Sequence, residues 1–238
     1  MSDFIHAGLL RLSQKIEAWL ASSEFRIASV PQQFACFQSE GISPALELQT
    51  HRFIHPALQH LTWALLSESD SGAYRAITLY ALPKPDLALP IFGLDYVGLG
   101  GIMPIAALDL APTDEVFWQN TAMTVLTALE PEHPDFIVRK VPNFAKAVFS
   151  EKALLVATKT ESGCIAMIEK AETLLDSYAQ WLHHPPVSET NQTERIQNWC
   201  RAMADNKKEA GALQRLFGPK VEIYLQEYLF QPPEFNLA

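Results

Sequence analysis

The stretch from Leu89 to Leu108, LPIFGLDYVGLGGIMPIAAL, decides the fold. Two apolar runs, Ile91–Val97 and Ile102–Leu110, flank the glycines at positions 98, 100 and 101, and this pattern predicts two β-strands joined by a tight turn. A connection this short joins antiparallel neighbours. We therefore expect an antiparallel hairpin in the middle of a sheet.

The surrounding sequence extends this hairpin into a larger sheet and adds helices before and after it. Further strands are predicted at Ala45–His51, Leu61–Leu66, Ala73–Leu82 and Ala153–Thr158. Helices are predicted at Phe4–Leu20, Pro112–Leu129, Glu161–His183 and Glu189–Phe230, the last interrupted near Gly218-Pro219. This order favours an α/β fold, a three-layer α/β/α sandwich with a central antiparallel sheet, as a single domain over residues 1–238.

The bulk composition is that of a soluble globular protein. The 238 residues are 48% hydrophobic and 19% charged, with a net charge of −9 that argues against nucleic-acid binding. The apolar run at 89–108 contains Asp95, glycines and prolines, so we expect no membrane span. Asp3 stands where a secretory signal would be basic, and three widely spaced cysteines suggest no disulfide framework. We expect a cytoplasmic monomer.

Asp95 is the only charged residue between Leu89 and Leu108. A carboxylate among apolar neighbours loses hydration, which raises its pKa and allows it to deliver a proton near neutral pH. In a strand it would share a face with Ile91, Gly93 and Val97, and Gly93 would leave room for a flat ligand. The alternative is that Asp95 is solvated at a strand end or caps the glycine turn.

Other common sites find little support in the sequence. No strand is followed by a dinucleotide-binding or phosphate-binding glycine motif, and no serine elbow or Cys-His pattern is present. His51, His55 and His60 lack an acid or cysteine that would complete a ligand set, so we expect no metal site.

The segments LPIFGLDYVGLGG at 89–101 and AALDLAPT at 106–113 resemble the central signature of the ferredoxin-dependent bilin reductases, and most closely the phycocyanobilin-forming branch. The likeness continues in YALPKP at 80–85, and at Asn206, Leu213, LFG at 216–218, Tyr224 and YLF at 228–230. It implies an α/β/α sandwich that holds biliverdin or a related bilin between the sheet and the C-terminal helices. It also implies no bound cofactor, single electrons from reduced [2Fe–2S] ferredoxin, and protons from side chains. Asp95 falls on the family's catalytic aspartate.

Two positions depart from what the resemblance implies. Thr78, seventeen residues before Asp95, stands where the phycocyanobilin-forming enzymes have histidine and the phycoerythrobilin branch has asparagine. A hydroxyl can orient a ligand but does not replace imidazole as an acid near neutral pH. Lys207 stands where several reductases have an aspartate that helps to protonate the bilin. We therefore expect a two-electron reduction or a variant regiochemistry.

Further substrate contacts are expected from three places. Asn206 shares a helical face with an apolar stripe and matches a family asparagine; a bilin carbonyl or a backbone group would satisfy its amide. Arg139 and Lys140 lie near the place where the family holds a propionate, or they are exposed loop charges. His60 matches a family histidine, or it is a polar residue at a strand end.

Arg201, Lys208 and Arg215 recur every seven residues. This spacing predicts a basic stripe that would receive an acidic ferredoxin, or a solvated helix face. Two other functions stay open: a bilin-binding carrier or chaperone-like protein without reductase activity, and a reductase of another open-chain tetrapyrrole, such as a chlorophyll breakdown product.

Overall fold

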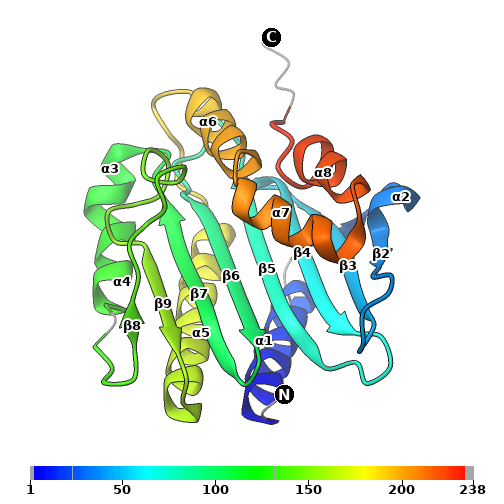
Figure 1. Ribbon diagram of the computed structural model, residues 1–238. Coiled ribbons are helices and arrows are strands. Elements are labelled where there is room, and N and C mark those ends of the chain that lie inside the picture. Colours follow the sequence, from blue (N-terminus) through cyan, green and yellow to red (C-terminus); the bar gives the residue numbers. More distant parts are fainter. Residues whose placement is uncertain (1–2, 23, 131, 234–238) are drawn as a thin grey trace.

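The computed structural model describes residues 3–22, 24–130 and 132–233, and its centre is one antiparallel sheet (Figure 1). Within these residues the sheet has nine strands in the order β1-β3-β4-β5-β6-β7-β9-β8, with β2 also paired to β3. The strands are β1 (Arg26–Ala28), β2 (Cys36–Gln38), β3 (Leu46–His55), β4 (Leu58–Glu68), β5 (Tyr74–Pro83), β6 (Ile91–Leu99), β7 (Ile102–Ala111), β8 (Ile137–Val138) and β9 (Leu154–Thr158).

Helices cover both faces of the sheet. In Figure 1 α1 (Asp3–Ser22) and α5 (Glu161–His183) lie behind it, and α6 (Thr193–Ala204), α7 (Lys207–Phe217) and α8 (Lys220–Tyr224) lie in front. The remaining helical segments are α2 (Gln32–Ala35), α3 (Glu115–Phe117), η1 (Trp118–Ala122), α4 (Met123–Ala128) and η2 (Leu225–Leu229). The expected three-layer α/β/α sandwich with a central antiparallel sheet is confirmed.

Strand β6 shows why the two faces differ. Its residues Phe92, Leu94 and Tyr96 are buried in the apolar core on the side of α1 and α5, and Tyr96 Oη donates a hydrogen bond of 2.8 Å to the carbonyl of Met167. Because side chains alternate along a strand, Gly93 and Asp95 face the C-terminal helices instead. A side chain at Gly98 would overlap with Ile5, so this glycine allows α1 to approach the sheet closely.

Three short strands were not expected from the sequence. β1, β2 and β8 have two or three residues each, too few for a hydrophobic period, and they exist because β3 and β9 offer open edges with which they pair. They widen the sheet at both ends and leave its centre, which carries the signature segment, unchanged.

The helix expected from Glu189 to Phe230 is also more divided than its pattern suggested. Besides the interruption at Gly218-Pro219, the chain leaves the helix at Asp205, and Asn206 caps a new one by accepting a hydrogen bond from the backbone N–H of Glu209. In the sequence, the apolar residues keep a helical spacing across this junction, although the helix itself is interrupted there.

Two further expectations concern cysteines and membranes. Cys36, Cys164 and Cys200 are all free thiols. Within the described ranges, no helix is both long enough and apolar enough to span a bilayer.

Candidate active site

A large cavity lies between the front face of the sheet and the C-terminal helices. Its volume is about 1780 Å³, above the range of roughly 300–1,000 Å³ that is typical of small-molecule pockets. The floor comes from β3 to β7, and α6 and α7 lie on the front side of the sheet, with α7 crossing in front of β5, β4 and β3 (Figure 1). Space of this size suits an extended ligand with several rings.

The predicted face of β6 forms the middle of the floor. Ile91, Gly93, Asp95 and Val97 all line the cavity, as expected for alternate residues of one strand. A Cβ atom added to Gly93 would meet no other atom within 4 Å. Gly93 therefore leaves open space two residues from Asp95, in agreement with the sequence prediction.

Asp95 lies neither at a strand end nor at the glycine turn. It is paired with Thr78 across β5 and β6, and Thr78 Oγ1 donates a hydrogen bond of 2.8 Å to Asp95 Oδ1. Burial raises the pKa of the Asp95 carboxyl, while the Thr78 hydrogen bond opposes this effect. Asp95 is thus a half-buried side chain in mid-strand, and its role as a proton donor stays a prediction.

A second carboxyl in the cavity, Glu209, was missed from the sequence. It lies in the first turn of α7, and Asn206 Nδ2 donates a hydrogen bond of 2.8 Å to its Oε2. Burial, and then the nearby charge of Asp95, raise the pKa of Glu209 to about 8. The spacing Asn206-x-x-Glu209 resembles a capping box, a signal that could have placed the start of α7 and this side chain.

Asn206 itself lines the cavity, but its polar groups have partners within the chain. Its side-chain oxygen caps α7 and its amide contacts Glu209, whereas the sequence left a bilin carbonyl or a backbone group as the candidates. Asn206 therefore positions Glu209 in this structure.

Asp109 is a third acid on the cavity wall, with a structural role. Its carboxylate accepts hydrogen bonds from the backbone N–H and the hydroxyl of Ser150, and burial raises its pKa to about 6. This contact joins β7 to the end of the loop that carries Arg139 and Lys140.

Several cations line the same cavity. Arg139, Lys140 and Lys146 come from the loop after β8, and Lys207 and Lys208 come from the first turn of α7. All five side chains are exposed, and none forms an ion pair with a carboxylate among the residues that the structure describes. Arg139 and Lys140 thus lie along the cavity, and their contact with an anionic ligand stays a prediction.

His60 is not part of the cavity lining. The ring lies against Tyr80, with the centroids 5.9 Å apart, and burial lowers the His60 pKa to about 3. Tyr80 does line the cavity, and His60 packs edge-on against its ring. A direct contact of His60 with a substrate stays a prediction.

The three residues expected to dock ferredoxin do not form a stripe on one helix. Arg201 is on α6, where it donates hydrogen bonds to Asn198 and Gln197, while Lys208 and Arg215 are on α7. The seven-residue spacing crosses the break at Asp205-Asn206. It therefore does not place Arg201 on the same helix face as the other two residues. All three side chains are exposed, and the docking role stays a prediction.

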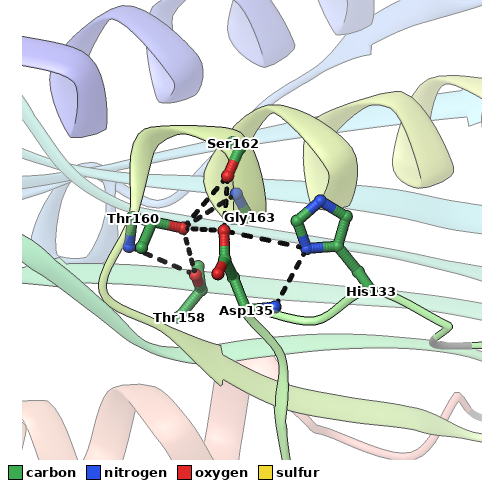
Figure 2. A network of polar contacts seen from close by, with 6 residues as sticks. All are labelled: His133, Asp135, Thr158, Thr160, Ser162 and Gly163. Carbon is green, nitrogen blue, oxygen red and sulfur yellow. Dashed lines mark hydrogen bonds and ion pairs between the residues drawn. The ribbon is translucent and has the colours of Figure 1, made fainter.

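Outside the cavity, one polar cluster combines a histidine, an aspartate and hydroxyl groups (Figure 2). Asp135 accepts hydrogen bonds from Thr160 and Ser162, and its backbone N–H donates to His133 Nδ1 at 3.2 Å. In a hydrolase triad the histidine lies between the other two groups, whereas here the aspartate does. Thr160 caps α5 through the N–H of Gly163, so the cluster fixes the start of that helix.

An α/β/α sandwich, a half-buried aspartate on the cavity floor and exposed cations along the cavity characterise this protein. Comparison with known proteins shows to which family these features belong. The pattern of the ferredoxin-dependent bilin reductases matches residues 13–231. The chain belongs to this family.

Individual relatives are distant. The chain is 29% identical over 162 residues to phycocyanobilin:ferredoxin oxidoreductase of Trichodesmium erythraeum, a match that spans 63% of each protein. It is 24% identical over 215 residues to 15,16-dihydrobiliverdin:ferredoxin oxidoreductase of Nostoc punctiforme, covering 82% of this chain and 87% of that one.

A solved structure supports the fold. Phytochromobilin synthase from tomato, determined in complex with biliverdin, superimposes with a TM-score of 0.67 at 16% identity. The match covers 92% of this chain and 81% of the tomato protein. At this identity the likeness concerns the arrangement of the helices and the sheet.

Proposed function

We propose that the protein reduces an open-chain tetrapyrrole of the biliverdin type, with electrons from reduced [2Fe–2S] ferredoxin and a proton from Asp95. The observation that carries this proposal is a half-buried carboxyl, hydrogen-bonded to Thr78 and with a raised pKa, on the floor of a cavity large enough for four linked rings. Membership in the family supports the electron donor and the class of substrate.

The cavity supports a bilin in two ways. Open floor beside Gly93 accommodates a flat conjugated ligand, and the basic rim offers partners for its two propionates. A planar guanidinium such as that of Arg139 binds a carboxylate through two hydrogen bonds, and Lys140 adds a point charge.

The electrons and protons of the proposed step balance as follows. Two molecules of reduced ferredoxin each give one electron and are oxidised, while two protons add to one double bond of the bilin, which becomes a single bond. Asp95 supplies one proton and recovers it from solvent. Thr78 contributes a hydrogen bond to Asp95 and no acid of its own, which favours a two-electron product.

One observation favours a second candidate function. Because a hydroxyl and not an imidazole contacts Asp95, the protein could bind the bilin without reducing it, as a carrier or chaperone-like protein. The raised pKa of Asp95 favours the reductase, because a carrier has no need of a proton-holding acid on the cavity floor.

The experiment that separates the two candidates is anaerobic incubation of the protein with biliverdin, followed by reduced ferredoxin. The reductase predicts a change in absorption on binding and a second change to a shorter-wavelength product after reduction. Binding without the second change would favour the carrier, and a panel of other open-chain tetrapyrroles then tests for a different substrate.

A further inference from the structure

Glu209 enters the cavity from the side opposite the sheet. Asp95 lies on the floor, in β6, whereas Glu209 belongs to the first turn of α7, a helix that crosses in front of β5, β4 and β3 (Figure 1). A flat ligand between the sheet and α7 would therefore have one carboxyl on each side.

The side chain of Glu209 is held in place but only half satisfied. Oε2 accepts the hydrogen bond from Asn206 Nδ2, and Oε1 has no hydrogen-bond partner among the described residues. Oε1 is thus available to a ligand group in the cavity.

Helix capping does not account for this arrangement. In a capping box the glutamate accepts a hydrogen bond from the backbone N–H of the cap residue. Here the backbone N–H of Asn206 donates to the carbonyl of Met203, and Glu209 accepts from the side-chain amide of Asn206 instead. The cap of α7 is complete through the Asn206 oxygen and does not need the Glu209 carboxylate.

The surroundings also favour a protonated Glu209. Two carboxyls in one cavity of low polarity do not both ionise readily, because each charge opposes the other. Burial and Asp95 together raise the Glu209 pKa to about 8, and no cation of the described chain forms an ion pair with it.

We infer that Glu209 is the second proton donor of the bilin reduction, acting on the ligand from the α7 side while Asp95 acts from the sheet side. This inference rests on the proposed function. The two-electron step needs two protons; Asp95 gives one and Glu209 gives the other, through Oε1, to the bilin radical or anion formed by the ferredoxin electrons. Both carboxylates then recover a proton from water at the cavity mouth.

The test is the variant Glu209→Gln, which keeps the size of the side chain and an oxygen for the Asn206 hydrogen bond but holds no transferable proton. In a stopped-flow experiment with bilin-loaded protein and reduced ferredoxin, we expect the first one-electron intermediate to appear at the wild-type rate. Product formation should then fall by roughly 10²-fold or more, the usual effect of removing a general acid. Bilin affinity should change less than threefold, since roughly one weak contact is altered.

The matched control is Glu222→Gln, the same substitution at an exposed site on α8. It should form product within twofold of wild type. Asp95→Asn gives the comparison for the other acid.

The outcomes separate the two claims. If wild type makes product and Glu209→Gln makes it equally fast, the inference on Glu209 is wrong and the proposed function stands. If Glu209→Gln loses bilin binding and intermediate formation together, Glu209 serves binding and not proton transfer. If wild type reduces no bilin, the proposed function fails and the inference falls with it.

Discussion

Thr78 acts on Asp95 through a single hydrogen bond of 2.8 Å. The bond stabilises the carboxylate and so lowers the Asp95 pKa against the larger effect of burial, which raises it. Histidine at this position would bring a titratable group, whereas threonine only adjusts how firmly Asp95 holds its proton.

Replacement of this threonine tests that account. In Thr78→Val the hydrogen bond is lost, so the pKa of Asp95 should rise and the carboxyl should stay protonated to higher pH. Infrared difference titration of the protonated carboxyl band measures this directly, with Glu209→Gln as the background so that only one of the two coupled acids titrates. Thr78→Ser, which keeps the hydroxyl, should titrate as the parent protein does, and an unshifted band in Thr78→Val would contradict the assigned contact.

The sequence predicted on which face of its strand Asp95 lies but missed Glu209, for a physical reason. Asp95 stands alone in an apolar strand, so period-2 alternation fixes its face. Glu209 lies in a polar stretch, NKKE, beyond a helix break that the apolar period conceals. Reading Asn206 as a cap and not as a member of one long helix would have placed Glu209 in a first turn.

At the scale of single elements, one face of β6 packs in the apolar core and the other face lines the cavity. Phe92, Leu94 and Tyr96 pack toward α1 and α5, which leaves Gly93 and Asp95 for the ligand. We therefore expect that adding a side chain at Gly93 would weaken ligand binding but would not impair folding.

The variant Gly93→Val should reduce bilin affinity about tenfold or more, because the added methyl groups occupy open floor beside Asp95 while β-branched residues suit a strand. Absorbance titration with biliverdin measures the affinity, and thermal unfolding checks that stability is retained. Gly211→Ala on α7, also in open space but outside the cavity lining, is the control and should bind as wild type does. Equal affinity of Gly93→Val and wild type would show that the ligand does not lie over β6.

The strands and helices that the sequence predicted are those long enough to show a period. β1, β2 and β8 could not be found in this way, because two or three residues give no pattern and their partners are distant in sequence. The break between α6 and α7 was hidden for the opposite reason, since the apolar residues continue in phase across it.

At the scale of the whole molecule, charge is distributed unevenly. The chain carries a net charge of −9, yet five exposed cationic side chains line the cavity, and Arg201 and Arg215 lie exposed on α6 and α7. Basic residues on this face would attract an acidic electron donor toward the ligand and away from the rest of the surface.

The double variant Arg201→Glu with Arg215→Glu tests this docking face, because neither residue lines the cavity. We expect the KM for ferredoxin to rise about tenfold at low salt, with bilin affinity unchanged and a smaller difference from wild type at high salt, where screening weakens such attraction. Steady-state kinetics at two ionic strengths provides the measurement. Lys170→Glu, on α5 behind the sheet, is the control, and equal KM values in the double variant and wild type would place docking elsewhere.

The central claim is that Asp95 protonates a bilin which ferredoxin reduces, and the most direct measurement is anaerobic turnover of biliverdin by wild type and by Asp95→Asn. Both proteins should bind biliverdin. Wild type should convert it to a reduced bilin with two equivalents of reduced ferredoxin, and Asp95→Asn should be slower by roughly 10²–10⁴-fold. Equal rates in the two proteins, or binding without any reduction by wild type, would contradict the account.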